Sequence, residues 1–468
     1  MEAINGEERD MERRLSKLLE ESVVSKPESG EINSSCCGGK GKSKGQGQPE
    51  QGTGEVDIVK TKASCCSGPK GATNGRKSAE SAGENISSCG GGKGKSQAQG
   101  QSEQGTGEVD IVKTKASCCG GSKGATNGRK SADEVREDVK EYYGRIIQTK
   151  EDLQTSACCT EEKFPSYVKP LAGMVADEVA SKFFGCDFCV PNVLENTSVL
   201  DLGSGSGFDC FIISQLVGET GRVVGVDMTD SQVELANKYT QWHADRFGFE
   251  KSNVTFHKGY IEKLDELGLD DASFDVVVSN CVLNLSPDKE AVLTEAYRVL
   301  RTGGEMYFSD VYALRRVPDN LKDDPVLRGE CISGALYWND FITLARKVGF
   351  TDPRVVQSEP YFVDDSLMDK LDGTEFVSTT FRLFKVSNLE ATIEDYGQAV
   401  KYKGSIFSAP AQLVFDRDNI FEAGAVVPVS RNTFRMLRAS RFRSHFDFYG
   451  CCSKKHFGPF PRSQPITI

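Results

Sequence analysis

The stretch from Ser198 to Asp209 constrains the fold more than any other part of the chain. Residues 198–202 have the pattern of a buried strand, and glycines then occupy every second position, Gly203, Gly205 and Gly207. An apolar run with helical spacing follows. Glycine lets the backbone approach a ligand closely, and the first turn of a helix offers unpaired N–H groups. The sequence therefore predicts a strand, loop and helix that together bind a nucleotide-like cofactor.

The spacing of these glycines separates two cofactor classes. A dinucleotide-binding turn favours G-x-G-x-x-G, and its third glycine would stand where this chain has Phe208. The chain instead has D-x-G-x-G-x-G from Asp201 to Gly207, which resembles the first motif of S-adenosylmethionine-dependent methyltransferases. A structural turn without a ligand remains the alternative for this motif taken alone.

Strands and helices alternate after the glycine turn. Further strands are predicted at 222–227, 254–257, 274–279 and 305–309, and the intervening helices include 230–247 and 288–300. We expect Asp230 or Ser231 to cap the first of these helices, because Ser231 and Glu234 fit a capping box. The alternation predicts an α/β fold with a mostly parallel, doubly wound sheet and helices on both faces.

The flanking segments have weaker patterns. Helices are expected at 135–147, at 171–184 and, with a break, at 326–345. Strands at 354–357 and 376–386 are expected to give the sheet an antiparallel edge. Short strand patterns at 412–415 and 425–428 predict a small appended C-terminal domain.

The N-terminal part differs from the rest in composition. Residues 29–132 are rich in Gly, Ser, Lys and Gln, and the first aromatic residue of the chain is Tyr142. Such a segment buries too little apolar surface to offset the entropy of ordering, so a long disordered tail is predicted for residues 1–132. Residues 51–66 recur as 104–119, each copy ending in a pair of adjacent cysteines. These pairs could capture soft ions, or the repeat is a copied spacer.

Charge and cysteine content limit the partners of the chain. The net charge is −11, which disfavours nucleic acid as a general partner. No apolar run approaches the ~20 residues of a membrane span, and the N-terminus lacks the apolar core of a signal peptide. The chain has 16 cysteines, which we interpret as thiol chemistry in a reducing compartment. The sequence thus predicts a cytoplasmic protein, expected to be a monomer, without nucleic-acid or membrane partners.

Polar residues at the predicted strand ends define a cofactor site. Asp227 ends the second strand, where a carboxylate can accept both ribose hydroxyls, and Met228 beside it can pack on the adenine. The segment from Gly259 to Glu262 suits the adenine, and Asn280 suits the methionine portion. With the glycine turn and a tyrosine of the first helix, the predicted cofactor set is Tyr143, Asp201, Gly203, Gly205, Gly207, Asp227, Met228, Gly259, Ile261, Glu262 and Asn280.

Two cysteines are predicted close to this site. Cys281 directly follows the fourth strand, and Cys331 follows the fifth strand in the region expected to cover the substrate. A lone buried cysteine is most often an inert core residue, but a pair at the mouth of a cofactor site indicates thiol chemistry. Cys186 and Cys189 form a C-x-x-C pair, which is half of a zinc site, yet the chain has only 4 histidines. Structural zinc is therefore a minor alternative.

Several cysteine-bearing segments together resemble the arsenite methyltransferase family over residues 135–390. They are DLQTSAC ending at Cys158, FGC ending at Cys186, SNCVLNL around Cys281 and GEC ending at Cys331, together with the glycine motif. The resemblance implies a class I, Rossmann-like methyltransferase that methylates trivalent arsenic and uses S-adenosylmethionine as cofactor. Its implied catalytic thiols are Cys158, Cys186, Cys281 and Cys331, of which Cys186, Cys281 and Cys331 bind arsenic.

The resemblance carries further expectations. The substrate is arsenite or its thiol conjugates, and successive methylation gives mono- and dimethylated arsenicals in detoxification. A disulfide between Cys186 and either Cys158 or the adjoining Cys159 is implied, reset by glutathione or thioredoxin. The expected domains are a tail (1–132), a cofactor domain (133–310), an arsenic-binding and sheet-completing region (311–390), and a small C-terminal domain with tail (391–468).

The chemistry of arsenic suits such ligands. Trivalent arsenic is soft and prefers thiolate sulfur, and three thiolates leave its lone pair free to face a sulfonium methyl group. Two other functions stay open at this stage. One is methyl transfer to another small molecule, such as a lipid quinone or sterol, and the other is sequestration of As(III) by a thiol-rich protein.

Overall fold

The computed structural model describes residues 130–147, 152, 164–185, 187–450 and 454–461. The predictions for the repeated tail, for Cys158, Cys159 and Cys186, and for the last residues of the chain fall outside these ranges. Every structural statement below concerns the described residues.

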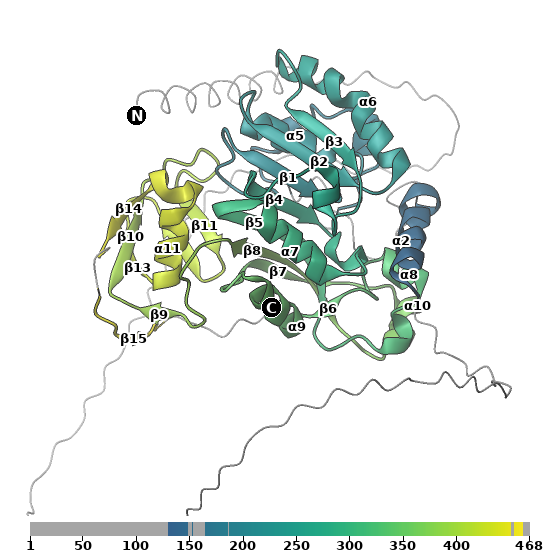
Figure 1. Cartoon of the computed structure of the whole chain (residues 1–468). Coiled ribbons are helices and arrows are strands. Elements are labelled where there is room, and N and C mark those ends of the chain that lie inside the picture. Colours follow the sequence, from purple (N-terminus) through teal and green to yellow (C-terminus); the bar gives the residue numbers. More distant parts are fainter. Residues whose placement is uncertain (1–129, 148–151, 153–163, 186, 451–453, 462–468) are drawn as a thin grey trace, which may run out of the picture. The chain divides into compact units, whose positions relative to one another are not determined.

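A single large sheet forms the centre of the methyltransferase-like part (Figure 1). Its strands follow the order β3-β2-β1-β4-β5-β8-β7, and β6 pairs with the end of β5. The first five are parallel, whereas β8 runs antiparallel to both β5 and β7. The bounds are β1 Ser198–Leu202, β2 Arg222–Asp227, β3 Val254–Lys258, β4 Phe274–Asn280, β5 Leu300–Ala313, β6 Leu336–Tyr337, β7 Arg354–Tyr361 and β8 Phe376–Phe384. The predicted doubly wound, mostly parallel sheet is confirmed.

Both faces of the sheet are covered, as continuous apolar strands require. Because successive side chains of a strand point to opposite faces, Val199 and Leu200 belong to different core clusters. On one face the core includes α7 (Lys289–Val299) and α9 (Trp338–Val348). On the other face it includes α5 (Phe208–Val217), beside α6 (Asp230–Phe247), which contacts β2 and β3. This double cover leaves the strand ends as the open side of the sheet.

Two local expectations were wrong. Thr229, not Asp230 or Ser231, precedes the first residue of α6, and no side-chain cap is made there. The Asp227 carboxylate accepts a hydrogen bond from Thr229 N (2.8 Å), so the chain already turns before Asp230. A complete capping box occurs elsewhere, where Ser131 and Glu134 begin α2 (Ala132–Glu141).

The second correction concerns helix continuity. The helix expected at 171–184 is two short helices, α3 (Lys169–Ala172) and α4 (Asp177–Ala180), because the chain turns at Gly173. The break expected within the helical segment 326–345 is confirmed, and it is long. The segment contains α8 (Pro325–Gly329), a loop, β6 and the start of α9. Cys331 lies in that loop with φ +61°, a conformation that no helix can continue.

The first helix is close to its prediction. After α2 the chain makes a π-helical turn at Tyr142–Ile146, so the helical segment ends one residue before 147. Short π-helical segments often mark functional sites. Here the turn places Tyr142 and Tyr143 next to the loop that follows α8.

The C-terminal part is the predicted small domain with β-structure. A three-stranded sheet has the order β13-β10-β14, and a hairpin joins β11 and β12. Helix α11 packs against β10 and β14. The bounds are β9 Glu394–Asp395, β10 Gln398–Tyr402, β11 Gln412–Asp416, β12 Asn419–Glu422, β13 Val426–Val429, α11 Arg431–Ala439, β14 Phe446–Tyr449 and β15 Gly458–Pro459.

A buried cluster of ion pairs connects this domain to the central sheet. Glu305 of β5 is fully buried and accepts hydrogen bonds from Arg382 of β8 (3.2 Å) and from Arg441 after α11 (3.2 Å). Burial alone would raise the pKa of Glu305, but the two guanidinium groups lower it below its usual range. The carboxylate is therefore ionised in the interior and depends on both arginines.

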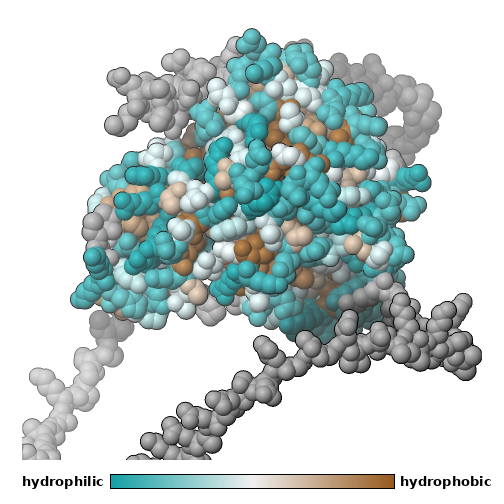
Figure 2. Space-filling view, viewed as in Figure 1, coloured by the Kyte–Doolittle hydropathy of each residue, from teal (hydrophilic) through white to brown (hydrophobic). Residues whose placement is uncertain are grey.

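The visible surface is mainly hydrophilic (Figure 2). Apolar side chains form small separate areas on this face, in keeping with a core that is enclosed by the helices. Within the described ranges, none of the helices has the length and hydropathy needed to cross a membrane.

We predict that Glu305→Gln destabilises the protein by about 3–5 kcal/mol, because two buried arginines lose their counter-charge. The measurement is equilibrium unfolding in urea. The matched control is Glu290→Gln, which removes one partner of the exposed Lys347–Glu290 pair and should cost less than about 1 kcal/mol. Equal and small losses in both variants would show that the cluster does not hold the domain in place.

Candidate functional site

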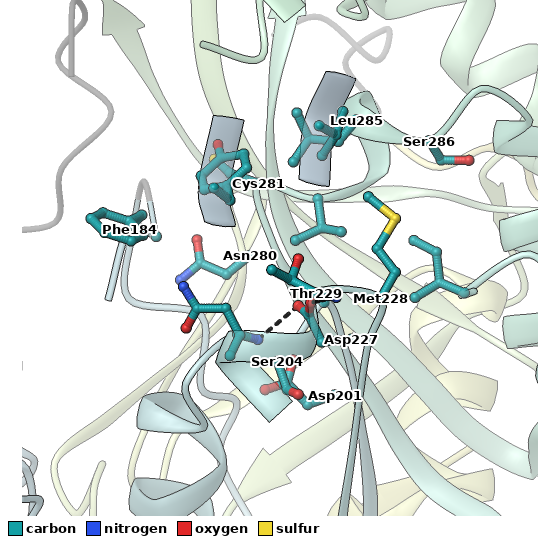
Figure 3. Close-up of a pocket in the computed structure, with 18 of the residues that line it drawn as sticks. Phe184, Asp201, Ser204, Asp227, Met228, Thr229, Asn280, Cys281, Leu285 and Ser286 are labelled. Carbon is teal, nitrogen blue, oxygen red and sulfur yellow. Dashed lines mark hydrogen bonds between the residues drawn. The ribbon is translucent and has the colours of Figure 1, made fainter. Parts of the chain in front are cut away.

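A cavity opens at the carboxyl ends of β1, β2 and β4, where ligands of doubly wound sheets bind (Figure 3). Most of the predicted cofactor residues line it: Tyr143, Asp201, Gly203, Gly205, Asp227, Met228, Gly259, Ile261, Glu262 and Asn280. Cys281 lines the same cavity. The structure therefore brings residues from five separate segments together around one space.

Gly207 is the predicted cofactor residue that does not line the cavity. It lies at φ +88° directly before α5, and a Cβ atom there would approach the ring of Phe256 to 2.6 Å. Gly207 therefore allows the turn into the helix and its close packing rather than contact with a ligand.

Asp227 shapes the glycine loop. Its carboxylate accepts hydrogen bonds from Gly205 N (2.9 Å, dashed in Figure 3) and from Thr229 N. These two bonds fix the loop after β1 against the end of β2. Both oxygens of the carboxylate thus accept a backbone hydrogen bond, and the position of the group at the cavity wall is set before any ligand binds.

Two buried polar atoms at the cavity wall have no protein partner. Ser204 Oγ and Gln232 Oε1 belong to lining residues, and neither makes a hydrogen bond within the described part of the chain. Between them, Gly205 has φ +51°, and a Cβ atom there would meet only Gln232 Oε1, at 4.0 Å. A ligand with several hydroxyl and amino groups can satisfy such atoms. These residues fit S-adenosylmethionine.

The cavity is acidic. Burial, together with the neighbouring Asp209, raises the pKa of Asp201 to about 8, and burial raises that of Asp209 to about 6. Burial also raises the pKa of Asp227, against the hydrogen bonds that it accepts. Carboxyl groups in this state favour a cationic ligand, whose charge would restore their ionised form. A sulfonium cofactor has that charge.

Asn280 connects the cavity to the segment before β1. Its Nδ2 donates to the Asp187 carbonyl (2.7 Å) and to Asp209 Oδ2 (3.2 Å). A Cβ atom on Gly185 would lie 2.4 Å from Asn280 Nδ2, so only glycine allows this approach. Phe184, on the same segment as Gly185, also lines the cavity (Figure 3).

The sequence reasoning missed several lining residues. Asp209, Gln232 and Arg136 all line the cavity. Asp209 and Gln232 lie in the first turns of α5 and α6, close to the predicted strand ends, and could have been found from that position. Arg136 could not, because α2 is distant in sequence. It approaches Glu262 (3.5 Å) and lies over the Tyr260 ring at 4.8 Å.

The two predicted cysteines meet at this end of the sheet. Cys281 follows β4 and Cys331 follows α8, and both are buried. The Cys331 thiol donates to the Cys281 backbone carbonyl at 3.2 Å. Both residues have positive φ, +57° and +61°, which is uncommon for residues other than glycine and concentrates at functional sites.

Asn284 holds the Cys331 loop in place. Its Nδ2 donates to the carbonyls of Val311 (2.6 Å) and Cys331 (3.4 Å), while its N–H donates to Asp310 Oδ2 (2.9 Å). A Cβ atom on Gly334 would lie 1.9 Å from the Asn284 carbonyl oxygen. The loop therefore packs on Asn284 through backbone contact, and this is possible because residue 334 is glycine.

The described cysteines differ in chemical state. Cys281 is disulfide-bonded, whereas Cys189, Cys210 and Cys331 are free. Burial, with Asp310 and Glu330 nearby, raises the pKa of the Cys331 thiol well above its usual range, and Lys289 and Tyr143 oppose this. Cys331 is thus protonated in the free protein, and a soft ion would have to displace its proton.

Cys189 is the described member of the C-x-x-C pair that was considered as half of a zinc site. Cys189 is buried and donates to the Ser279 carbonyl at 3.2 Å. No group of three or more His, Cys, Asp or Glu residues that could hold a metal ion occurs within the described residues. The predicted site thiols Cys158 and Cys186 lie outside them.

The chain is similar in sequence to known methyltransferases. A methyltransferase-domain model matches residues 194–349, and an arsenite methyltransferase C-terminal domain model matches residues 396–461. The arsenite methyltransferase of Aquipseudomonas alcaligenes is 54% identical over 327 residues, covering 70% of this chain and 94% of that protein. The arsenite methyltransferase of Homo sapiens is 46% identical over 315 residues, covering 67% and 83%.

A solved structure agrees with these relatives. The crystal structure of an arsenic (III) S-adenosylmethionine methyltransferase from Chlamydomonas reinhardtii has 48% sequence identity and a TM-score of 0.61, and covers 64% of this chain and 99% of that one. The similarity therefore spans nearly the whole of that methyltransferase. The chain belongs to the arsenite methyltransferase family.

Proposed function

We propose that this protein transfers methyl groups from S-adenosylmethionine to trivalent arsenic held by cysteine thiolates, giving mono- and dimethylated arsenicals in detoxification. The observation that carries the proposal is the contact of the Cys331 thiol with Cys281, which lines the cofactor cavity. The named activity of the relatives supports it. Methyl transfer to a quinone or sterol would not need two thiols there.

The cavity residues hold and orient the cofactor in this proposal. When bound, S-adenosylmethionine supplies an electrophilic methyl group on a sulfonium. Asp227 and the loop through Gly205 bind the ribose side, and Met228 and Ile261 pack on the adenine. Asn280 and Asp209, which are already joined by a hydrogen bond, hold the methionine portion next to Cys281.

Arsenic is the substrate, and the thiols position it. Cys281 and Cys331, with Cys186 as the third ligand, hold As(III) as a pyramid whose lone pair faces the methyl donor. The lone pair carries no proton, so the transfer needs no general base, and positioning supplies much of the rate. Each of the three thiols loses its proton as it binds, and with arsenite the protons leave with the displaced hydroxides as water. The proton of Cys331 is the hardest of the described ones to remove, because burial disfavours its thiolate.

The proposal also requires a reductant. Cys281 in a disulfide cannot bind arsenic, so a thiol must first reduce it. Each methyl transfer uses the arsenic lone pair and leaves arsenic pentavalent, so two electrons must also be returned to it before the next transfer. We propose glutathione or thioredoxin as the reductant for both steps, with Cys158 or Cys159 as the further thiol of the cycle. A reducing compartment follows from the same chemistry, so we place the protein in the cytoplasm, as a monomer acting on arsenite or its thiol conjugates.

Both cysteines should be required for arsenic methylation. Cys281→Ser and Cys331→Ser should each abolish arsenic methylation, measured by speciation of products from As(III), S-adenosylmethionine and a thiol, because serine oxygen is a poor ligand for soft arsenic. Binding of S-adenosylmethionine should persist. Cys189→Ser is the matched control, since a hydroxyl can still donate to the Ser279 carbonyl. Methylation that survives both site changes would end the proposal.

The second prediction concerns pH. Cofactor affinity should rise by up to about tenfold per pH unit from pH ~6 to ~8, because a cation binds better as Asp201, with its pKa of about 8, becomes ionised. Calorimetric titration of S-adenosylmethionine measures this, and Asp201→Asn should flatten the profile. S-adenosylhomocysteine lacks the sulfonium charge and should show a weaker dependence. Parallel profiles for the two ligands would contradict the assignment.

The third prediction separates catalysis from sequestration by the tail. A chain that begins at Lys130 keeps the Ser131 cap of α2 and should methylate arsenic at a rate within about twofold of the full chain, because the site residues described above all follow Ser131. Turnover of the two chains is compared directly. A truncated chain that binds cofactor but no longer methylates would show that the tail cysteines take part.

A further inference from the structure

A second cavity borders the loop that carries Cys331. It has a volume of about 380 Å³, which lies within the usual range for small-molecule sites. We call it the basic cavity, because it is lined by Lys130, Lys289, Arg316, Lys322 and Arg328. Its acidic lining residues are Asp323 and Asp340, and Asp340 is already bound by Arg316 through two hydrogen bonds of 2.7 Å.

Two of these cations have no carboxylate partner in the described structure. Arg328 is 8% exposed and donates only to the Lys322 carbonyl. Lys289 is half-buried and donates to the carbonyls of Asn284 (3.3 Å) and Ser286 (3.0 Å). Burial lowers the pKa of Lys289 to about 8. Asp310 and Glu262 act electrostatically on Lys289, and Asp323 and Asp138 act on Arg328, but none of them forms an ion pair with these cations within the described residues. A largely buried cation without a direct carboxylate partner favours an anionic ligand.

A separate observation points to a ligand at the same place. Ser333 lines the basic cavity and is 3% exposed, and its hydroxyl has no hydrogen-bond partner among the described residues. A buried hydroxyl without a partner costs free energy, which a bound acceptor would recover. A carboxylate is such an acceptor.

The position of the basic cavity relates it to the arsenic site. Ser286 and Pro287 line both this cavity and the cofactor cavity, and Figure 3 shows Ser286 at the edge of the latter. On the other side, Ser333 and Gly334 follow Cys331 by two and three positions. A small molecule anchored here therefore has the loop of Cys331 beside it.

We propose that the basic cavity binds the carboxylates of a small peptide thiol, either free or as the thiol that carries arsenic. The guanidinium of Arg328 suits a carboxylate through paired N–H donors, Lys289 adds charge, and Ser333 donates a hydrogen bond. This assignment rests on the proposed function for the role of the thiol. The binding itself is independent of methyl transfer.

The test is calorimetric titration of the full chain with S-methylglutathione, which has both carboxylates and no free thiol. Wild-type protein should bind it, more weakly as salt increases, and should not bind the peptide with both carboxylates esterified. Arg328→Gln and Lys289→Gln should each weaken binding at least about tenfold, and Ser333→Ala about threefold or more. Lys347→Gln, an exposed lysine outside the cavity, is the matched control and should bind like wild type.

S-adenosylmethionine binding reports whether each variant is folded. If Arg328→Gln or Lys289→Gln fails that check, Ser333→Ala and Lys322→Gln carry the test, because they change the cavity least. The proposal is overturned if wild type does not bind S-methylglutathione, if no cavity variant weakens it, or if inorganic phosphate binds and the peptide does not.

Kinetics distinguishes the two sources of the carboxylates. If arsenic arrives with its thiol, Arg328→Gln should raise the KM for the arsenic–glutathione conjugate but not for arsenite presented by dithiothreitol, which has no carboxylate. If the free thiol is bound, both KM values stay unchanged while S-methylglutathione binding is lost. A protein that binds S-methylglutathione but methylates no arsenic would refute the proposed function alone.

Discussion

The hydrogen bond from the Cys331 thiol to the Cys281 carbonyl joins two parts of the chain that are 50 residues apart. One part is the end of β4 in the cofactor sheet, and the other is the loop after α8. Both cysteines adopt a left-handed backbone conformation to meet, and the surrounding contacts of Asn284 and Gly334 hold them there. The contacts around the two cysteines thus offset the cost of their unusual backbone conformation. Such strained conformations are concentrated at functional sites.

Two cavities of opposite charge lie on either side of the Ser286–Pro287 segment. The cofactor cavity has buried carboxyl groups whose pKa values are raised. The basic cavity has Lys289 and Arg328, which form no ion pair within the described residues. Charge would therefore direct a cationic methyl donor to the cofactor cavity and an anionic thiol to the basic cavity before either approaches the cysteines. Such separation favours one productive arrangement over non-specific binding of either molecule at the other site.

The sheet was predictable from sequence, because apolar strands and glycine turns are local patterns. The positions of Asp227 and Asn280 at strand ends followed from the same patterns. Contacts across distant segments were not predictable. Arg136 reaches the cavity only because α2 packs beside it. A break within 326–345 was expected, but its position at Cys331 depends on a backbone conformation that the sequence does not signal. The role of Gly207 was misread, because a packing glycine and a ligand-binding glycine look alike in a motif.

The central claim is that these cysteines bind one arsenic atom together, and arsenic X-ray absorption spectroscopy of the reduced full-length protein with one equivalent of As(III) measures this directly. The account predicts a first shell of three sulfur atoms, which falls when Cys331 is replaced by serine and is unchanged for Cys189→Ser. A shell that contains oxygen or nitrogen in place of sulfur, or one that is unaffected by Cys331→Ser, would contradict it.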